Sequence, residues 1–291
     1  MVQDIRDRPA IRHADVVELN FIRADSPYCF RRHFRQGLRS HILEILKRAD
    51  VAAENAGIVF DGVRRFPRAR PDNMLRIFRA RLQTLEQALE EIGRVKVVET
   101  FLGPDCIAES SEFLVDYQGP GGASIMLCGF QAYVQGELLD PWGLLDRDRL
   151  FATLYNSLHK DRERSERHRQ AWISAAQRKG IRFIQAVKRM IAEVRHVPDL
   201  AGAGNLVVTK AGQIKLVDIN NISPVVFDSG VVLDDKGYPV CDKSIEALAL
   251  LEQKITGQAI DAHEELYGFF LAPERRQRVT HQEEMFYRRP A

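Results

Sequence analysis

The sequence predicts an α+β protein with a strand-rich N-terminal part, up to about residue 135, and a mainly helical part after it. Short apolar runs separated by glycine and proline dominate the first part. After Pro141, leucine and isoleucine recur at helical spacing instead. The 291 residues suffice for one large domain or for two lobes that share a cleft.

Composition restricts the class of protein. The chain is 45% hydrophobic and 28% charged, which is ordinary for a globular protein. A formal net charge of +2 argues against a chain built mainly to coat nucleic acid, so no nucleic-acid partner is expected. The four cysteines stand apart and form no CxxC pair, which fits a reducing compartment. The N-terminus has no apolar signal region and no apolar run is long enough for a membrane span, so we expect a cytoplasmic protein.

Several elements are expected in the N-terminal part. The apolar residues 16–22 predict a strand, and Leu38, Ile42, Ile45 and Leu46 predict a helix up to about residue 54. A short strand is expected at residues 58–60, followed by a break at Pro67 and Pro71. Phe78, Leu82, Leu85, Leu89 and Ile92 then advance by four and three residues, which predicts a helix over about 72–93 that stops at Gly93.

Strands are expected next at residues 95–101, 112–117 and 124–134, with a hairpin turn at residues 119–122. In the C-terminal part, helical patterns cover residues 150–158 and 184–194, and a further helix is expected at 242–255. Between them, residues 206–209 and 214–217 flank a tight turn and predict a hairpin. The polar last twenty residues are expected to be loosely ordered.

The residues that suggest chemistry surround this hairpin. Asp199 follows a predicted helix, Asn205 opens the hairpin and Asp218 closes it. A tight hairpin brings its two ends together, and the loop before it brings Asp199 to the same end. Phosphoryl transfer needs hard oxygen ligands for Mg²⁺ and a carboxylate near the attacking hydroxyl, and these three side chains supply both.

The segment 196–220 resembles the catalytic segment of the protein-kinase-like superfamily. The resemblance implies a two-lobed protein-kinase-like fold, with an N-lobe at 1–135 and a helical C-lobe at 136–291. It implies ATP and Mg²⁺ as cofactors, bound in the cleft between the lobes. In that family the first Asp accepts the proton of the acceptor hydroxyl, and the Asn and the last Asp hold Mg²⁺. These roles fall on Asp199, Asn205 and Asp218.

The same resemblance extends outward from the hairpin. The predicted helix at 72–93 would correspond to the family's αC helix, and its Glu86 would pair with a phosphate-binding base or face solvent. The strand that ends near residue 134 would run into a hinge. The resemblance therefore implies that Tyr133, Val134, Gln135 and Glu86 contact the nucleotide.

The sequence departs from the family at defined positions. Asp199 and Asn205 are six positions apart where the family motif has five, and Asp218 is followed by Ile and Asn where the family has Phe and Gly. No GxGxxG loop and no V-A-I-K strand is present, and Arg64, Arg65 or Lys96 would have to replace the missing lysine. We therefore predict a nucleotide-binding protein with weak or absent phosphotransfer.

Two other interpretations stay open. The chain would otherwise be an active ATP-dependent phosphotransferase on an unknown protein or small-molecule hydroxyl, or an unrelated α+β binding domain. A separate feature is the group of seven arginines between residues 64 and 81, accompanied by a single acid, Asp72. Such a group binds phosphate, anionic lipid headgroups or RNA, or forms a solvated face that acids elsewhere in the fold neutralise.

Overall fold

The computed structural model describes residues 3–23, 25–34, 39–160 and 165–288. They form two compact units. Unit 1 extends to Gly93 and includes Ala108–Tyr133, whereas unit 2 contains Arg94–Ile107 and the chain from Val134 onward. The protein is thus mixed α+β, with a strand-rich N-terminal sheet and a helical C-terminal part. The predicted N-terminal lobe of residues 1–135 includes residues 94–107 and 134–135, which the structure groups with unit 2.

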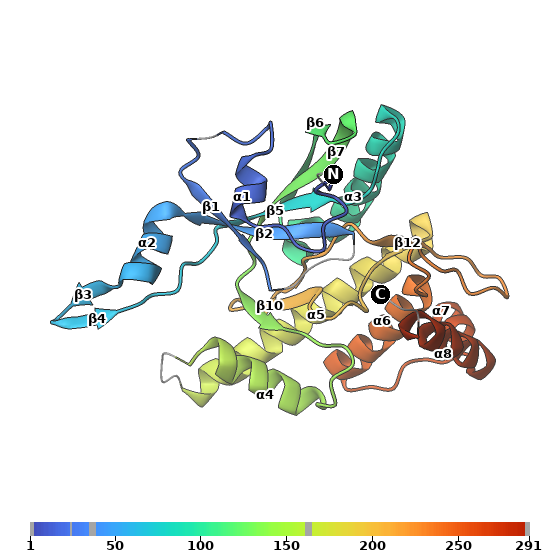
Figure 1. The fold of residues 1–291 in the computed structure, drawn as a ribbon. Helices are drawn as coiled ribbons and strands as arrows, with labels where there is room; N and C mark the ends of the chain where they lie inside the picture. Colours follow the sequence, from blue (N-terminus) through green and yellow to red (C-terminus); the bar gives the residue numbers. More distant parts are fainter. Residues whose placement is uncertain (1–2, 24, 35–38, 161–164, 289–291) are drawn as a thin grey trace. The chain divides into compact units, whose positions relative to one another are not determined.

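Unit 1 is built on a five-stranded antiparallel sheet (Figure 1) in the order β1-β2-β5-β7-β6. Its strands are β1 (Tyr28–Arg32), β2 (Ser40–Lys47), β5 (Asn73–Phe78), β6 (Ser110–Gly119) and β7 (Gly122–Ala132). Unit 1 also contains α1 (His13–Val17), α2 (Arg48–Ala56), the separate hairpin of β3 (Ile58–Phe60) and β4 (Val63–Arg65), and the start of α3 (Leu85–Cys106). Residues from α1 and from strands β1, β2, β5, β6 and β7 form its core.

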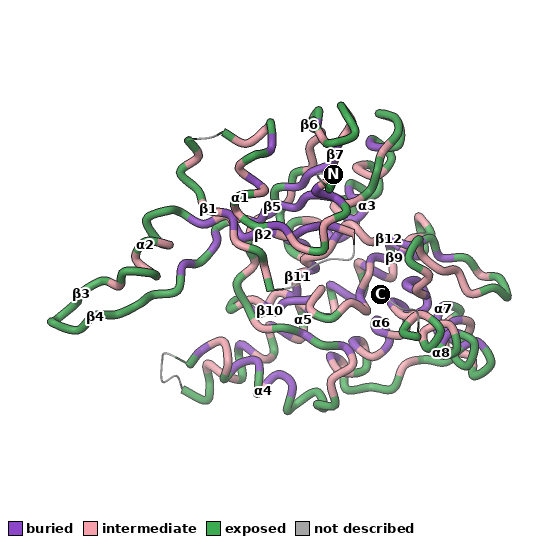
Figure 2. Tube along the Cα trace, in the orientation of Figure 1, coloured by how far each residue is buried: buried purple, intermediate pink, exposed green. Residues whose placement is uncertain are grey.

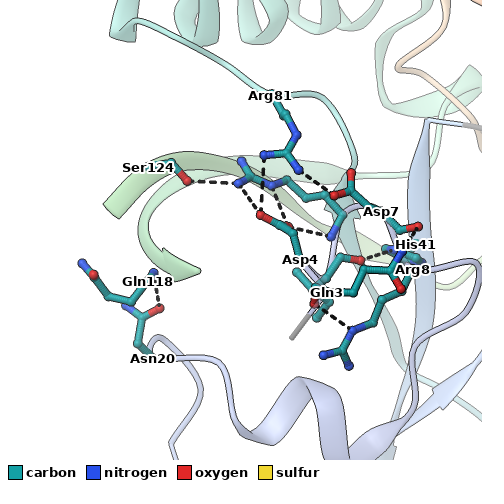
Figure 3. A network of polar contacts seen from close by, with 11 residues as sticks. Gln3, Asp4, Asp7, Arg8, Asn20, His41, Arg81, Gln118 and Ser124 are labelled. Carbon is teal, nitrogen blue, oxygen red and sulfur yellow. Dashed lines mark hydrogen bonds and ion pairs between the residues drawn. The ribbon is translucent and has the colours of Figure 1, made fainter. Parts of the chain in front are cut away.

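The N-terminal residues are held by a polar network (Figure 3). The Arg6 guanidinium donates to Asp4 at 2.8 Å and to the Ser124 hydroxyl at 3.2 Å. Arg81 donates to Asp7 at 2.6 Å, and a ring nitrogen of the buried His41 lies 2.9 Å from the carbonyl of Ile5. These contacts fix the first described residues against β2 and β7.

The expected strands at 58–60, 112–117 and 124–134 are confirmed, as is the hairpin turn at 119–122. The predicted strand at 16–22 is wrong, because Val16 lies in α1, whose start is fixed when the Asp15 carboxylate accepts the Arg12 N–H at 2.7 Å. The predicted helix at 38–54 is wrong in its first half, which forms strand β2, and residues 37–38 lie outside the described residues.

The αC-like helix expected at 72–93 is also misplaced. Residues 73–78 form the central strand β5, and the helix α3 begins only at Leu85. It continues through Gly93, so the strand expected at 95–101 is helical. The buried face of α3 is Ala88, Val95, Val98 and Leu102, whereas the predicted stripe residues Leu85 and Leu89 are about half exposed.

Unit 2 is mainly helical, and buried residues run along its helices (Figure 2). Its helices are α4 (Arg147–Leu158), α5 (Glu166–Val194), α6 (Val240–Thr256), α7 (Glu265–Phe270) and α8 (Pro273–Tyr287), together with the end of α3. Its strands are β8 (Gly136–Leu138), β9 (His196–Pro198), β10 (Leu206–Thr209), β11 (Ile214–Leu216) and β12 (Ile222–Pro224). Asp146 and Ser165 cap α4 and α5 by accepting backbone N–H groups, as the orphan amides of a first turn require.

The helices and the hairpin expected in the C-terminal part are confirmed. Residues 136–138, for which no strand is predicted, form β8 because they pair with β10. One expectation there is wrong. The last twenty residues are not loose as far as they are described, since Val279 and Arg275 of α8 are buried. Among the described residues, no helix is long and apolar enough to cross a membrane.

Candidate functional site

Two antiparallel strand pairs in unit 2 position the predicted site residues. Strand β9 pairs with β12, with Pro198 opposite Ile222, and the Asp199 N–H extends this pair by donating to the Asn221 carbonyl at 2.8 Å. Strand β10 pairs with β11, with Leu206 opposite Leu216. Asp199 therefore leaves the first pair at the point where the chain turns toward the second.

Both oxygens of the Asp199 carboxylate accept hydrogen bonds. Oδ1 accepts the backbone N–H groups of Ala201 and Gly202, each at 3.0 Å, and Oδ2 accepts the Asn221 side-chain amide at 3.2 Å. The carboxylate thus forms the turn of its own loop. Its position is fixed by backbone donors and not by a flexible side chain alone.

Asn205 lies against this loop. Its Nδ2 donates to the main-chain carbonyl of Asp199 at 2.9 Å, and its backbone N–H donates to Gly202 at 3.1 Å. A Cβ atom at Gly202 would lie 2.4 Å from Nδ2 and 2.9 Å from Oδ1, so this glycine lets the amide pack against the loop. No described residue donates to Oδ1, which leaves an oriented amide oxygen.

Asp218 reaches the same place through the hairpin. The Val217 N–H donates to the Asn205 carbonyl at 2.8 Å, which joins the two ends of β10 and β11. Burial raises the pKa of the Asp199 carboxyl, and the negative charge of nearby Asp218 raises it further. The backbone and Asn221 hydrogen bonds oppose this rise. Asp199, Asn205 and Asp218 thus form one cluster, as the sequence predicts.

Helix α6 and the segment before α4 both bind the loop that follows Asp199. The Leu200 N–H donates to the Ser244 hydroxyl at 3.2 Å, and the Trp142 indole N–H donates to the Ala201 carbonyl at 3.1 Å. Leu200 and Ser244 are fully buried. Packing on both sides of the loop preorganises the cluster.

The side chains of the cluster suit Mg²⁺ as ligands in one respect, the number of carboxylates. No group of three or more His, Cys, Asp or Glu side chains capable of holding a metal occurs in the described part of the chain. Mg²⁺, however, commonly takes one or two carboxylates and fills its remaining positions with waters and substrate phosphates. Asp199 and Asp218 are two carboxylates that lie close enough for the charge of one to raise the pKa of the other, which matches that number of carboxylates.

The three predicted hinge residues lie between β7 and β8. Tyr133 is the last residue of unit 1, and its N–H donates to Asp72 at 3.0 Å. Val134 and Gln135 begin unit 2 and lead directly into β8, where Gly136 pairs with Thr209 of β10. Val134 and Gln135 therefore lie near the turn end of the hairpin, whereas Asn205 lies at the opposite end of β10.

The other predicted contacts lie in exposed positions. Glu86 is exposed in the first turn of α3, where its own backbone N–H and Thr84 lower its pKa. Arg64 and Arg65 lie on the exposed strand β4. Lys96 is exposed on α3 and pairs with Glu99 at 2.7 Å. No contact among the described residues joins these four side chains to the cluster.

Arg6, Arg76 and Arg275 are buried cations that are not predicted from the sequence, and Arg76 is the least exposed of the three. Arg76 lies on the central strand β5 of unit 1 and is only 2% exposed. Its signal was present, because an arginine interrupts the apolar run Met74-Leu75-Arg76-Ile77-Phe78 at a position that the surrounding pattern buries. The prediction of a helix over 72–93 does not account for this arginine, because residues 73–78 form a strand.

Unit 2 also contains a cavity of about 600 Å³ between α5 and the end of α3. Lys179, Arg182 and Arg189 line it from α5, and Asp105 and Cys106 line it from α3. None of the three cluster residues lines this cavity. It is a separate feature of unit 2.

No protein-family model matches the chain, and no curated protein matches it significantly.

Proposed function

We propose that the cluster of Asp199, Asn205 and Asp218 binds Mg²⁺ together with the phosphates of ATP, and that phosphotransfer is weak or absent. The observation that carries the proposal is the orientation of Asn205. Its amide nitrogen is fixed to the main-chain carbonyl of Asp199, whose carboxylate senses the charge of Asp218, while its amide oxygen accepts nothing from a described residue. A divalent cation at this oxygen would also relieve the repulsion between Asp199 and Asp218.

The placement of the hinge residues favours an elongated ligand. Strand β10 has four residues and so spans about 13 Å. Val134 and Gln135 lie near one end of it and Asn205 at the other. A nucleotide whose base contacts the first end and whose phosphates contact the second satisfies both sets of groups.

Weak or absent transfer follows from what surrounds the cluster. The resemblance calls for backbone amides of a glycine-rich loop and a fixed lysine, neither of which the sequence supplies. Removing such preorganised groups typically costs about 10²–10³ in rate for each group. Asp199 is moreover held by two backbone N–H groups and by Asn221, which limits its freedom to meet an acceptor hydroxyl.

Thermal unfolding tests the binding step. ATP with Mg²⁺ at about 100 times the dissociation constant should stabilise the protein by roughly 2.7 kcal/mol. Asp218→Asn should abolish the part that depends on Mg²⁺. Asp148→Asn, which changes an exposed acid on α4, is the matched control and should respond as the wild type does. A flat response of the wild type to millimolar ATP, with and without Mg²⁺, contradicts the proposal and favours an unrelated α+β binding domain.

ATP turnover by the purified protein tests the chemical step. We expect none, or a slow rate that both Asp199→Ala and Asp218→Ala remove. A rate in the usual kinase range of about 1–100 s⁻¹ that both substitutions remove would instead establish an active phosphotransferase. That second function is favoured by one observation, since the raised pKa of Asp199 makes it a better proton acceptor than an ordinary carboxylate.

A further inference from the structure

The hairpin of β3 and β4 in unit 1 forms a separate structure, which we call the arm and define as residues 57–66. Its strands pair in register, with Ile58 opposite Arg65 and Phe60 opposite Val63. Asp61 and Gly62 make a two-residue turn with φ of 50° and 75°, as a tight hairpin turn requires. Figure 1 shows the arm extending away from the five-stranded sheet of unit 1. The arm is therefore a regular two-stranded hairpin with a tight turn.

The arm exposes apolar side chains that a folded protein normally covers. Every residue of β3 and β4 is exposed (Figure 2). The large apolar side chains of the arm are Ile58 (49% exposed), Val59 (65%), Phe60 (57%), Val63 (56%) and Phe66 (62%). A two-stranded hairpin has no core of its own and is marginally stable in water. A contiguous exposed apolar patch of this kind marks an interaction site.

The apolar residues occupy both faces of the hairpin. Cross-strand pairing puts Ile58, Phe60 and Val63 on one face together with Arg65, and it puts Val59 on the other face together with Arg64. A partner with a flat surface would cover only one of these faces. An environment that surrounds the tip covers both.

The charge of the arm and of the residues that follow it is positive. Arg64, Arg65, Arg68 and Arg70 are exposed, and Asp61 is the only acid between residues 57 and 70. None of these arginines has an acidic partner among the described residues. Arg65 lies over the Phe60 ring at 5.4 Å, and Arg64 donates to the Ala56 carbonyl at 3.0 Å. The Arg64 guanidinium thus lies toward the base of the arm, whereas the Arg65 guanidinium lies beside Phe60.

We propose that the arm inserts the apolar side chains that flank its Asp61-Gly62 turn into the interface of an anionic phospholipid bilayer. Phe60 and Val63 would enter the boundary between headgroups and acyl chains. The arginines would remain at the level of the lipid phosphates, because arginine buries its stem and keeps its charged group in the polar layer. This interaction needs no spanning segment, and it is independent of the cluster at Asp199.

Co-sedimentation of the full chain with lipid vesicles tests the proposal. We expect binding to vesicles of phosphatidylcholine mixed with phosphatidylglycerol, and at least tenfold weaker binding to phosphatidylcholine alone. Phe60→Ser with Val63→Ser should reduce binding at least tenfold, and replacing Arg64, Arg65, Arg68 and Arg70 together by Gln should remove its dependence on the anionic lipid. Leu144→Ser, at a fully exposed leucine of unit 2, is the matched control and should bind as the wild type does.

Because the arm contributes no buried side chain, the serine variant should unfold at the wild-type temperature. Equal binding by that variant, or no binding of the wild type to the anionic vesicles, overturns the proposal. So does a wild-type dimer in solution that the serine variant dissociates while vesicle binding is absent. In that case the arm binds a second copy of the chain.

Discussion

The side-chain amide of Asn205 donates a hydrogen bond to the main-chain carbonyl of Asp199 at 2.9 Å. This bond fixes the plane of the amide, and so it also fixes the direction of Oδ1. The same residue accepts the Val217 N–H through its backbone carbonyl at 2.8 Å. Asn205 therefore joins the loop that carries Asp199 to the strand end that carries Asp218.

Replacing Asn205 tests this joining role. Asn205→Ala removes the bond to Asp199 and should lower the free energy of unfolding by about 1 kcal/mol. It should also remove the Mg²⁺-dependent stabilisation by ATP. Differential scanning calorimetry with and without the ligand measures both effects. If Asn205→Ala loses stability but keeps the full Mg²⁺ response, the amide oxygen is not a metal ligand.

Gly202→Ala should damage the site through Asn205. The added Cβ would come within 2.4–2.9 Å of the Asn205 side-chain amide. Asn205 has a short side chain whose amide is bonded to Asp199, so the amide cannot move away without breaking that bond. We expect a loss of about 1–3 kcal/mol. The matched control is Gly93→Ala in α3, where a Cβ meets nothing within 4 Å. It should stabilise the protein by roughly 0.5–1 kcal/mol. Chemical denaturation of both variants would reveal a clash if their effects have opposite signs.

Asp199→Asn should stabilise the protein at neutral pH. Since burial and Asp218 raise the folded-state pKa of Asp199, the native state binds more protons than the unfolded state between the two pKa values. Stability is therefore lost as pH rises through that window, and the loss persists at pH 7. The amide removes this loss, and it keeps the contact with Asn221 when the Asn221 side chain turns its amide oxygen toward the new N–H group. A net gain of about 1 kcal/mol would raise the Tm by roughly 2–4 °C.

Thermal unfolding at pH 7 and below pH 4 measures this effect. The advantage of Asp199→Asn should be present at pH 7 and shrink at the lower pH. Asp148→Asn, at an exposed position, should show no such difference. Equal Tm values for Asp199→Asn and wild type at pH 7 would contradict the electrostatic account of the cluster.

For His41 we expect the opposite effect of pH on the stability of the protein. Burial, followed by the nearby charge of Arg79, lowers its pKa from 6.5 to about 4. The neutral ring with a proton on Nε2 donates to the Ile5 carbonyl at 2.9 Å, while Nδ1 faces an Arg79 N–H at 3.4 Å. The unfolded state binds more protons between pH 4 and 6.5, so stability is lost as pH falls through this range.

The loss should be on the order of 2 kcal/mol, because each unit of pKa change is worth about 1.4 kcal/mol. Urea titrations at pH 7.5, 5.5 and 4.5 measure it. His41→Gln retains a side-chain N–H donor without a titrating ring, and its stability should vary less over the same range. A wild-type profile no steeper than that of His41→Gln would show that His41 protonates without cost.

The buried ion pair of Asp242 and Arg275 joins α6 to α8. Both side chains are about 3% exposed, their closest atoms are 2.5 Å apart, and Arg275 also donates to the Asp228 carbonyl at 2.7 Å. Removing one buried partner leaves an uncompensated charge, so Arg275→Met should cost about 3–5 kcal/mol. The double variant with Asp242→Leu should recover most of this loss. Equilibrium unfolding of the four proteins gives the coupling energy, and additive losses would show that the two charges do not depend on each other.

The sequence was most informative where local signals and chemistry coincide. The hairpin at 206–217 has a turn, two apolar strands and polar residues at both ends, so its formation and the meeting of Asn205 with Asp218 followed from local rules. The helix α6 was likewise recognisable from Ile245, Leu248 and Leu251, which recur every three residues and are fully buried.

The failures occurred where a pattern has two interpretations. Strands β2 and β5 lie inside the sheet and are buried along most of their length, so they do not alternate in polarity and their leucines and isoleucines also fit a helix. The face of α3 was misassigned because Leu85 and Leu89 lie on its exposed side. The contact of Leu200 with Ser244 could not be predicted either, since it joins residues far apart in sequence and depends on packing.

The pairing of β8 with β10 has a consequence for the order of folding. The whole of α4 and α5 lies between these strands in the sequence, so their contact closes a long loop whose entropy must be lost before the contact contributes. Gly136 must also approach Val208 so closely that no side chain fits there. The sheet that holds Asn205 is therefore expected to form late, after the two helices. A ligand at this sheet would act mainly by slowing unfolding, because the chain has no site for it until folding is almost complete.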